Sequence, residues 1–396
     1  MSLQEIIKQK VQEQHQQTVA NRRHLHMNPE LSYHEFKTAA FVQQHLTEAN
    51  IPFKKDVGGL GIVALVEGKN PAKKVVALRG DMDALPIQET NAVEYKSKNE
   101  GVMHACGHDV HTSSLLGVGK LLSNMRNDFE GTVKLIFQPA EEKLPGGASL
   151  MIKDGVLENP MPSGIIGQHV MPHIQVGKVG FRSGIYMAST DELYMTVKGK
   201  GGHGAMPHFN IDPVLITAHI LVALQQIVSR NANPTMPSVL SFGKVIANGA
   251  TNVIPDEVKL EGTFRTLDEN WRSDVHKRLV HMASTIAASM GGKCELHIVR
   301  GYPALYNEPK LTSRVRSYAV DYLGKDNVED LDIWMAAEDF AYYSQVTDAC
   351  FYRLGTRNES RGITSSVHTS TFDIDEDALQ VGVGLMAYSA LKELGN

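Results

Sequence analysis

The sequence contains few cysteines. Cys106, Cys294 and Cys350 are the three cysteines in 396 residues, and they are far apart in the chain. An odd number of scattered cysteines does not form the disulfide framework of a small secreted domain. Residues 1–17 also lack the apolar core and the small residues typical of a secretory signal. We therefore predict a protein of a reducing compartment and expect it in the cytoplasm.

An excess of positive charge is also missing. The chain has 39 Lys and Arg against 44 Asp and Glu, a net charge of −5, which gives no general attraction to nucleic acid or to anionic membranes. The longest apolar stretch, residues 215–228, is interrupted by His219, Gln225 and Gln226 and is too short and too polar to cross a bilayer. We expect no nucleic-acid or membrane partner, and predict a small-molecule or short-peptide ligand.

The length and the pattern of elements predict two domains. Residues 1–184 and 302–396 contain helical patterns at 3–27, 32–49, 110–125, 310–322 and 376–394, and strand-like runs at 61–66, 75–78, 133–137, 164–168 and 350–354. They predict an α/β domain with a central mixed sheet flanked by helices. Residues 185–301 have the order βαββαβ, with strands at 192–197, 239–245, 259–265 and 294–300 and helices at 213–228 and 271–290. This order predicts an inserted ferredoxin-like α+β domain.

The segment MHACGHDVH, residues 103–111, is dense in metal-ligating side chains. Thiolate and imidazole are ligands that Zn²⁺ prefers, and Gly107 allows the chain to turn so that Cys106 and His108 reach one ion. A Cys-x-His pair without a second cysteine pair suits an open catalytic site better than a closed structural one. The alternative is that Cys106 is a small buried apolar residue and the histidines are ordinary hydrogen-bonded groups.

Further ligand-type side chains are expected at strand ends. Asp81 and Asp83 follow the strand at 75–78, Glu141 and Glu142 follow 133–137, and His169 follows 164–168. Functional loops of α/β sheets lie at the carboxyl ends of strands. Adjacent glutamates point in different directions, so one can bind a metal while the other accepts a proton from water, as metal-assisted hydrolysis requires. For the aspartate pair alone, a solvated turn is an equal alternative.

Two histidines near the amino terminus are less informative. His24 and His26 are one residue apart, so they do not share a face of the predicted helix. We favour a structural role for both histidines, and a position beside the substrate is the alternative.

A set of motifs closely resembles one enzyme family across nearly the whole chain. In order, the motifs are RGDMDALP, MHACGHDVH, QPAEE, GQHVMP, GKGGHGAMPH, TNVIP, AAEDFAYY and VHTSTF. Together they resemble the metal-dependent aminoacylase/carboxypeptidase family of zinc metallopeptidases. Within it they are most similar to the amidohydrolase branch of hippurate hydrolases, N-acyl-L-amino acid amidohydrolases, auxin-conjugate hydrolases and N-acetyldiaminopimelate deacetylases. The resemblance implies a zinc-exopeptidase-like catalytic domain with an inserted lid and dimerisation domain.

The resemblance also implies a metal site and its catalytic groups. The ligands that correspond to those of the family are Cys106, His108, Glu142, His169 and His368. One or two divalent ions are implied, Zn²⁺ first, although Mn²⁺, Co²⁺ and Ni²⁺ also suit a mixed N/O/S site. Glu141 corresponds to the general base, and Asp83 to a carboxylate that orients a ligand from behind. Asp81 stands where other branches place a histidine ligand.

The remaining implied roles fall in the insert. His203 corresponds to a histidine that reaches across a homodimer to steady the oxyanion. Asn252 and Arg265 resemble the residues that grip the substrate's carboxylate, although a surface salt bridge is the alternative for Arg265. The predicted activity is metal-dependent hydrolysis of N-acyl amino acids to a carboxylic acid and a free amino acid. A dipeptidase or carboxypeptidase using the same site, and a metal-binding protein without catalysis, are the alternatives.

Overall fold

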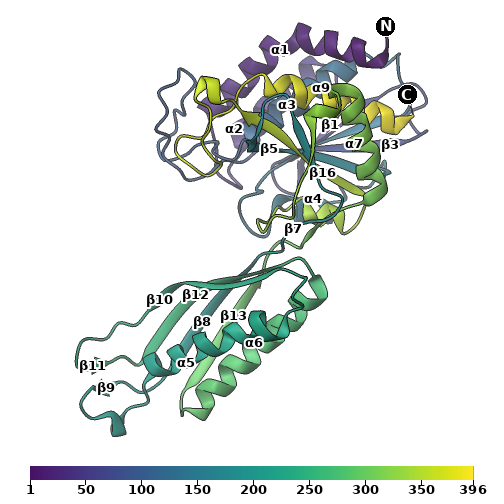
Figure 1. Cartoon of the computed structure of the whole chain (residues 1–396). Helices are drawn as coiled ribbons and strands as arrows, with labels where there is room; N and C mark the ends of the chain where they lie inside the picture. The colour runs from purple at the N-terminus through teal and green to yellow at the C-terminus, as the bar shows by residue number, and fades with distance from the viewer. Residues whose placement is uncertain (396) are drawn as a thin grey trace. The chain divides into compact units, whose positions relative to one another are not determined.

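The computed structural model describes residues 1–395, which divide into two compact units (Figure 1). The larger unit comprises residues 1–184, 306–333 and 339–395, and the smaller unit comprises residues 185–305 and 334–338. The smaller unit thus extends four residues beyond the predicted boundary at 301, and it also includes a short segment, 334–338, from the returning chain. The strands β7 (Gly184–Met187) and β14 (Leu305–Asn307) lie where the chain passes between the units.

The larger unit is built on an eight-stranded mixed sheet with the order β1-β2-β4-β3-β5-β16-β6-β15. Strands β3, β4, β5 and β16 are mutually parallel, so their carboxyl ends share one edge. The strands are β1 (Phe53–Val57), β2 (Gly61–Glu67), β3 (Val75–Asp81), β4 (Thr132–Gln138), β5 (Ile165–Gln175), β6 (Val179–Phe181), β15 (Val328–Asp330) and β16 (Ala349–Arg357). The predicted fold class, a central mixed sheet flanked by helices, is confirmed.

Helices cover this sheet, and α1, α3 and α9 pack against one another (Figure 1). Every residue of β3 and β4 is buried, because neighbouring strands and helices cover them on all sides. The α-helices of the unit are α1 (Leu3–Met27), α2 (Phe36–Glu48), α3 (His108–Ser123), α4 (Gly147–Lys153), α7 (Pro309–Leu323), α8 (Ala341–Ser344) and α9 (Ala378–Leu394), with short 3₁₀ turns at Lys325–Asn327 and Glu359–Arg361.

Two local predictions need correction. The helix predicted from residue 32 begins at Phe36, because the preceding segment forms a turn in which Tyr33 has a positive φ of 69°. The strand predicted to end before His169 continues to Gln175, so His169 lies inside β5 and pairs with Arg353 of β16. Both errors come from contacts with other segments, which local sequence patterns do not contain.

The smaller unit has a four-stranded antiparallel sheet with the order β10-β12-β8-β13, against which α5 and α6 pack. This is the ferredoxin-like order expected from βαββαβ. A two-stranded ribbon, β9 with β11, extends from one end of the sheet (Figure 1). The elements are β8 (Asp191–Lys198), β9 (Gly202–His203), a 3₁₀ turn (Pro207–Phe209), α5 (Pro213–Gln226), a π-helical turn (Ile227–Asn231), β10 (Ser238–Ile246), β11 (Val253–Ile254), β12 (Glu257–Thr266), α6 (Glu269–Ser289) and β13 (Lys293–Arg300).

One described helical stretch, Pro213–Asn231, has a length and composition that would also allow it to cross a bilayer. Core helices often share these properties. Here Ile216, Ile220, Leu224 and Ile227 are buried in the core of the smaller unit beneath the sheet. One face of the stretch therefore packs in the core of the smaller unit.

Candidate metal centre

The candidate centre begins at the amino end of α3. Gly107 precedes the helix with a φ of 83°, a conformation that glycine adopts readily. A Cβ added to Gly107 would approach a side-chain carbon of Val170 to 2.5 Å. Glycine is therefore required both by the turn and by the close approach of β5. The turn places Cys106 and His108 on either side of it, both buried.

The structure brings the five predicted ligands together. The Cys106 Sγ atom lies 3.4 Å from His169 Nε2 and 3.3 Å from His368 Nε2. His368 Nε2 in turn lies 3.3 Å from Glu142 Oε1. Cys106, His108 and His169 form one set of potential ligands, and Cys106, Glu142 and His368 another, with the ligand atoms of each set within 4.8 Å of one another.

Hydrogen bonds fix the orientation of the imidazoles. His169 donates from Nδ1 to the carbonyl of Val170 at 2.8 Å, and His108 donates from Nδ1 to Asp83 Oδ1 at 3.1 Å. The Nε2 lone pair of each ring therefore faces the cluster. His108 Nε2 is buried and has no hydrogen-bond partner among residues 1–395, which is costly unless a cation accepts its lone pair. The donor set and this orphaned nitrogen fit a divalent metal ion.

Asp83 is not one of the predicted ligands, but it contacts two of them. Its Oδ2 accepts hydrogen bonds from Ser32 Oγ at 2.7 Å and from the backbone N–H of Glu142 at 2.9 Å. One buried carboxylate thus orients His108 through one oxygen and the backbone of Glu142 through the other. This geometry agrees with the orienting role predicted for Asp83.

The electrostatics of the ligands also favour a cation. Burial, followed by the carboxylates of Glu142 and Glu141, raises the pKa of the Cys106 thiol well above its ordinary value. Burial lowers the pKa of His169 well below its ordinary value, so this ring is neutral and able to bind a metal. Burial also opposes protonation of His108, but Asp81 and Asp83 outweigh it and raise the pKa to about 10. Binding of a divalent cation would therefore displace protons from Cys106 and His108.

Asp81 interacts with Arg79 and His111, which are not among the predicted ligands. Its carboxylate forms a buried ion pair with Arg79 and accepts a hydrogen bond from His111 Nδ1 at 2.5 Å. His111 uses its second nitrogen as well, because Nε2 accepts the Val170 N–H at 2.9 Å. Asp81 and His111 therefore brace α3 against β3 and β5, and the ligand-type group formed by Asp81, His108 and His111 is already largely satisfied by protein.

Glu141 lies beside the ligands. One of its oxygens belongs, with His108 and Glu142, to a further group of potential ligand atoms within 4.8 Å of one another. Its Oε1 also accepts a long hydrogen bond, 3.4 Å, from the backbone N–H of Asp339. A carboxylate in this position can accept a proton from a water molecule near the ion.

The smaller unit brings together two of its three predicted residues. His203 of β9 pairs with Val253 of β11, and the Gly204 N–H donates to the carbonyl of Asn252 at 2.8 Å. Both residues therefore belong to the ribbon at one end of the sheet (Figure 1).

Arg265 lies at the other end of this sheet. It is near the end of β12, and because a strand rises about 3.3 Å per residue, it is about 26 Å from Glu257 at the start of that strand. Its Nη1 donates to the carbonyl of Met335 at 3.2 Å, and no carboxylate lies within ion-pair distance of it in residues 1–395. The alternative role in a surface salt bridge is thus absent from this structure, and Arg265 is far from Asn252 within one chain.

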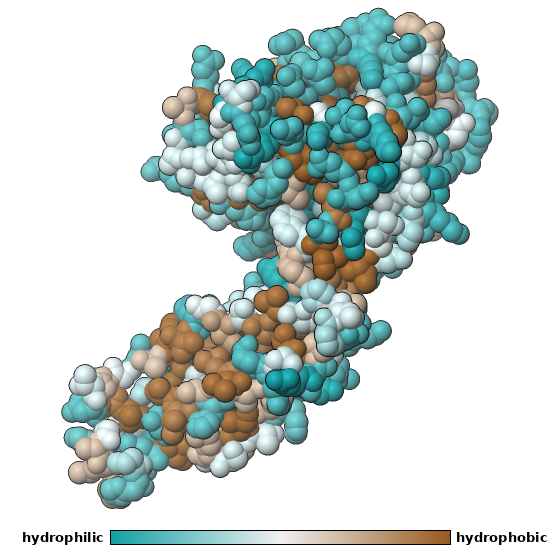
Figure 2. Space-filling view, in the orientation of Figure 1, coloured by the Kyte–Doolittle hydropathy of each residue, from teal (hydrophilic) through white to brown (hydrophobic). Residues whose placement is uncertain are grey.

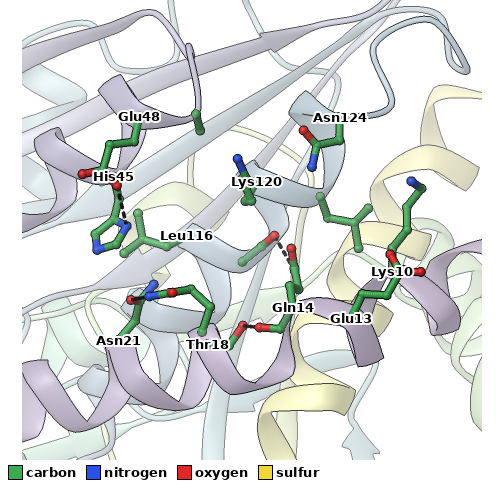
Figure 3. Close-up of a pocket in the computed structure, with 14 residues that line it drawn as sticks. Lys10, Glu13, Gln14, Thr18, Asn21, His45, Glu48, Leu116, Lys120 and Asn124 are labelled. Carbon is green, nitrogen blue, oxygen red and sulfur yellow. Dashed lines mark hydrogen bonds and ion pairs between the residues drawn. The ribbon is translucent and has the colours of Figure 1, made fainter.

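A separate hollow of about 500 Å³ lies among α1, α2 and α3 (Figure 3). Its polar lining residues largely bond to one another or to backbone: Gln17 donates to Asn21 at 2.9 Å, and Gln14 donates to the carbonyl of Gly117 at 2.9 Å. None of its lining residues is a predicted ligand, the predicted base or a substrate-binding residue. We assign it no role in the chemistry.

The early histidines have structural contacts. His26 is buried between Asp109, 2.8 Å from Nδ1, and Glu89, 3.3 Å from Nε2. His24 stacks on Phe41 with ring centroids 4.3 Å apart. These contacts agree with the structural interpretation.

Sequence reasoning missed several residues around the centre. Ser32, Glu35 and His111 contact the site or its supporting loops, but they were not predicted to do so. His111 belongs to a recognised cluster, and only its two hydrogen bonds reveal its role. For Ser32 and Glu35 no local signal exists, because their partners are 51 and 105 residues away in the chain.

Comparison with known proteins gives a consistent assignment. A family model described as peptidase family M20/M25/M40 matches residues 77–392. An N-acyl-L-amino acid amidohydrolase of Geobacillus stearothermophilus is 44% identical over 308 residues, which cover 76% of this chain and 81% of the relative. An N-acetyl-L-cysteine deacetylase of Bacillus subtilis is 39% identical over 378 residues, which cover 96% and 88%.

A solved structure supports the same assignment. The YxeP protein of Bacillus subtilis, described as a dinuclear metal-binding peptidase, matches with a TM-score of 0.81 and 33% identity, covering 96% of this chain and 98% of its own. The ligand clusters and these relatives indicate a hydrolase of amide bonds that binds divalent metal. The chain belongs to peptidase family M20/M25/M40.

Proposed function

We propose that this protein hydrolyses the amide bond of N-acyl amino acids and releases a carboxylic acid and a free amino acid. The observation that carries the proposal is the position of Glu141, a carboxylate beside the clustered ligands and next to Glu142 in the chain. The named activities of the amidohydrolase and the deacetylase relatives support the choice of substrate class.

The residues divide the chemistry between them. Cys106, His108, Glu142, His169 and His368 would hold one or two divalent ions, for which we propose Zn²⁺ first, with Mn²⁺, Co²⁺ and Ni²⁺ also suited. When bound, such an ion lowers the pKa of water and stabilises negative charge on oxygen. Glu141 accepts a proton from the attacking water and delivers it to the leaving amine nitrogen, while the hydroxyl oxygen bonds to the acyl carbon. Asp83 keeps His108 in the required tautomer.

We also propose a homodimer formed through the smaller unit. Asn252 and Arg265 lie at opposite ends of the unit, so they cannot both hold one carboxylate within the same chain. A second copy would supply His203 and Asn252 from its ribbon, with His203 stabilising the oxyanion.

The surface of the smaller unit supports this assembly. Apolar residues gather on the face shown in Figure 2, over the region of α5 and β10. Leu215 and Val222 of α5 are 52% and 76% exposed, and Val245 of β10 is 49% exposed. Exposed apolar residues on a helix and on an edge strand are typical of a surface that binds another protein.

The other proposals follow from composition and ligand chemistry. We propose that the partner is a small N-acyl amino acid or short peptide, without a nucleic-acid or membrane partner. The three free cysteines support a reducing compartment such as the cytoplasm.

A substrate panel tests the activity. Hydrolysis of hippurate, an N-acetyl amino acid and an unblocked dipeptide would be measured with the metal content, before and after chelation. We expect cleavage of capped substrates only, loss of activity on chelation and recovery on adding metal. Preferential cleavage of the dipeptide would favour the dipeptidase or carboxypeptidase alternative. Bound metal with no cleavage of any substrate would favour the alternative without catalysis.

A further inference from the structure

Residues 32–35, directly before α2, contact the loop after β4 that carries Glu141 and Glu142, and they do so at several points. Ser32 Oγ donates to Asp83, whose same oxygen accepts the Glu142 N–H. Tyr33 donates from its hydroxyl to the carbonyl of Lys143 at 3.0 Å. Glu35 accepts the backbone N–H of Ala140 at 2.7 Å through Oε1. The segment therefore contacts the loop just before and just after the pair Glu141 and Glu142.

Ala140 has an unusual backbone conformation. Its φ is 53°, in the left-handed region that residues with a Cβ rarely adopt without support from their surroundings. Ala140 is buried, and both of its backbone polar groups are held: the N–H by Glu35, and the carbonyl by the Gly147 N–H at 2.9 Å. The next residue is Glu141, so the dihedral angles of Ala140 set the direction in which Glu141 leaves β4.

Glu35 is not needed to cap its own helix. It occupies the N-cap position of α2, but its side chain makes no capping hydrogen bond. Glu30 satisfies this helix end instead, because its Oε2 accepts the Thr38 N–H at 2.8 Å and the Thr38 hydroxyl at 3.0 Å. The hydrogen bond from the Ala140 N–H therefore joins the Glu35 side chain to another part of the chain.

The burial of Glu35 is energetically costly. Its side chain is fully buried, and its Oε2 has no hydrogen-bond partner in residues 1–395. Burial, and then the charge of Asp83, raise the pKa of Glu35 to about 7. An apolar residue at this position would avoid the cost but would leave the Ala140 N–H without an acceptor.

We propose that Glu35 is a positioning residue that holds Ala140 in its left-handed conformation and so aims Glu141 at the attacking water. Among residues 1–395 Glu35 forms no ion pair with a predicted ligand, and it acts through the Ala140 N–H. This inference rests on the proposed function, because it takes Glu141 as the base.

The test compares Glu35→Ala, Glu35→Gln and the control Glu30→Ala with wild type, all as full-length protein. For each, kcat and KM on an N-acetyl amino acid, metal content, thermal midpoint and a crystal structure are determined. We expect Glu35→Ala to lower kcat about 10- to 100-fold, as is typical for residues that orient catalytic groups. KM and metal content should stay close to wild type, because the ligands are not altered.

The other variants separate positioning from stability. Glu35→Gln keeps an oxygen that can accept the Ala140 N–H, so kcat should return to within about threefold of wild type even if the thermal midpoint falls. Glu30→Ala removes a carboxylate that binds a backbone N–H of the same helix, and should lower the thermal midpoint while leaving kcat unchanged. The crystal structure of Glu35→Ala should show Ala140 outside the left-handed region.

Each contrary result has a distinct meaning. Unchanged kcat in Glu35→Ala, a loss that follows metal content, or Glu35→Gln as slow as Glu35→Ala would overturn the positioning role. Failure of wild type on every substrate would instead overturn the proposed function. In that case the crystal structure still decides, because a left-handed Ala140 in Glu35→Ala would show that Glu35 does not hold it.

Discussion

For each buried histidine of the centre, the partners of both ring nitrogens, Nδ1 and Nε2, are needed to identify its role. His108 and His169 each donate from Nδ1 to an oxygen, which leaves Nε2 to face the cluster. His111 uses both nitrogens for protein hydrogen bonds and is therefore a brace. The same residue type in one nine-residue motif thus has different roles, and hydrogen-bond partners distinguish them.

The first prediction concerns Glu141. Glu141→Gln keeps the size of the side chain but removes the basic oxygen, so turnover should fall about 10²- to 10⁴-fold. Metal content should not change, because Glu142 is the proposed ligand. Steady-state kinetics and metal analysis check both expectations. Glu142→Gln is the comparison, and it should lower metal content; turnover retained in Glu141→Gln would show that another group is the base.

The second prediction concerns the pH dependence of stability at Glu35. Its pKa is raised from 4.5 to about 7, so its contribution to stability is fully present below pH 4.5 and is lost as the pH rises through 7. Glutamine has no such titration. The free energy of unfolding of wild type, relative to Glu35→Gln, should therefore fall by on the order of 3 kcal/mol across this range. Urea denaturation at several pH values measures it, and a difference independent of pH would contradict the prediction.

At the scale of elements, the smaller unit contains a buried ion-pair network at the end of its sheet. Arg272 of α6 binds Asp191 at the start of β8, with Nη2 2.6 Å from Oδ1, and also donates to the carbonyl of Gly301 after β13. His276 adds a contact of 2.7 Å to the other oxygen of Asp191. The network joins the strands through which the chain enters and leaves the unit.

The third prediction follows from this network. Asp191→Ala leaves the fully buried Arg272 with its main partner removed, and should lower the free energy of unfolding of the unit by about 3 to 5 kcal/mol. Glu295→Ala is the control, because its pair with Lys198 is exposed and should contribute about 0 to 1 kcal/mol. Chemical denaturation of both variants measures the difference. Equal losses in the two would mean that burial does not strengthen the Asp191 pair.

At the scale of the whole molecule, the two ends of the smaller unit carry different predicted substrate-binding residues. Arg265 and the ribbon that carries His203 and Asn252 are separated by nearly the whole length of β12. A single chain therefore offers an incomplete set of substrate-binding groups, if all three act on one substrate. The proposed dimer would resolve this separation.

The fourth prediction tests the assembly. Val222→Lys places a charge on the exposed apolar face of α5 and should convert a dimer to monomers, because burial of an unpaired charge is costly. Turnover should fall with the dimer. Met161→Lys in the larger unit is the matched control, since Met161 is also 76% exposed, and it should change neither property. Sedimentation measures the mass, and a dimer that persists in Val222→Lys would exclude this face from the interface.

The sequence by itself determined the kinds of elements and the kinds of ligands. Periodic apolar residues predicted the longer helices of both units, five of the eight strands of the larger sheet and the βαββαβ order, because local backbone preference and side-chain spacing decide them. The short strands β1, β6 and β15 were not predicted. Cysteine, histidine and acidic residues at strand ends likewise indicated the cluster around Cys106, since parallel strands bring their ends to one edge.

Only the tertiary structure decided the exact ends of the elements and the orientation of the side chains in the site. The start of α2 at Phe36, the continuation of β5 past His169, and the bonds from Glu35 to Ala140 and from Ser32 to Asp83 all depend on segments distant in the chain. The separation of Arg265 from Asn252 likewise follows from strand pairing. No local pattern contains these contacts, because a hydrogen bond between residues 105 positions apart exists only after the intervening chain has packed.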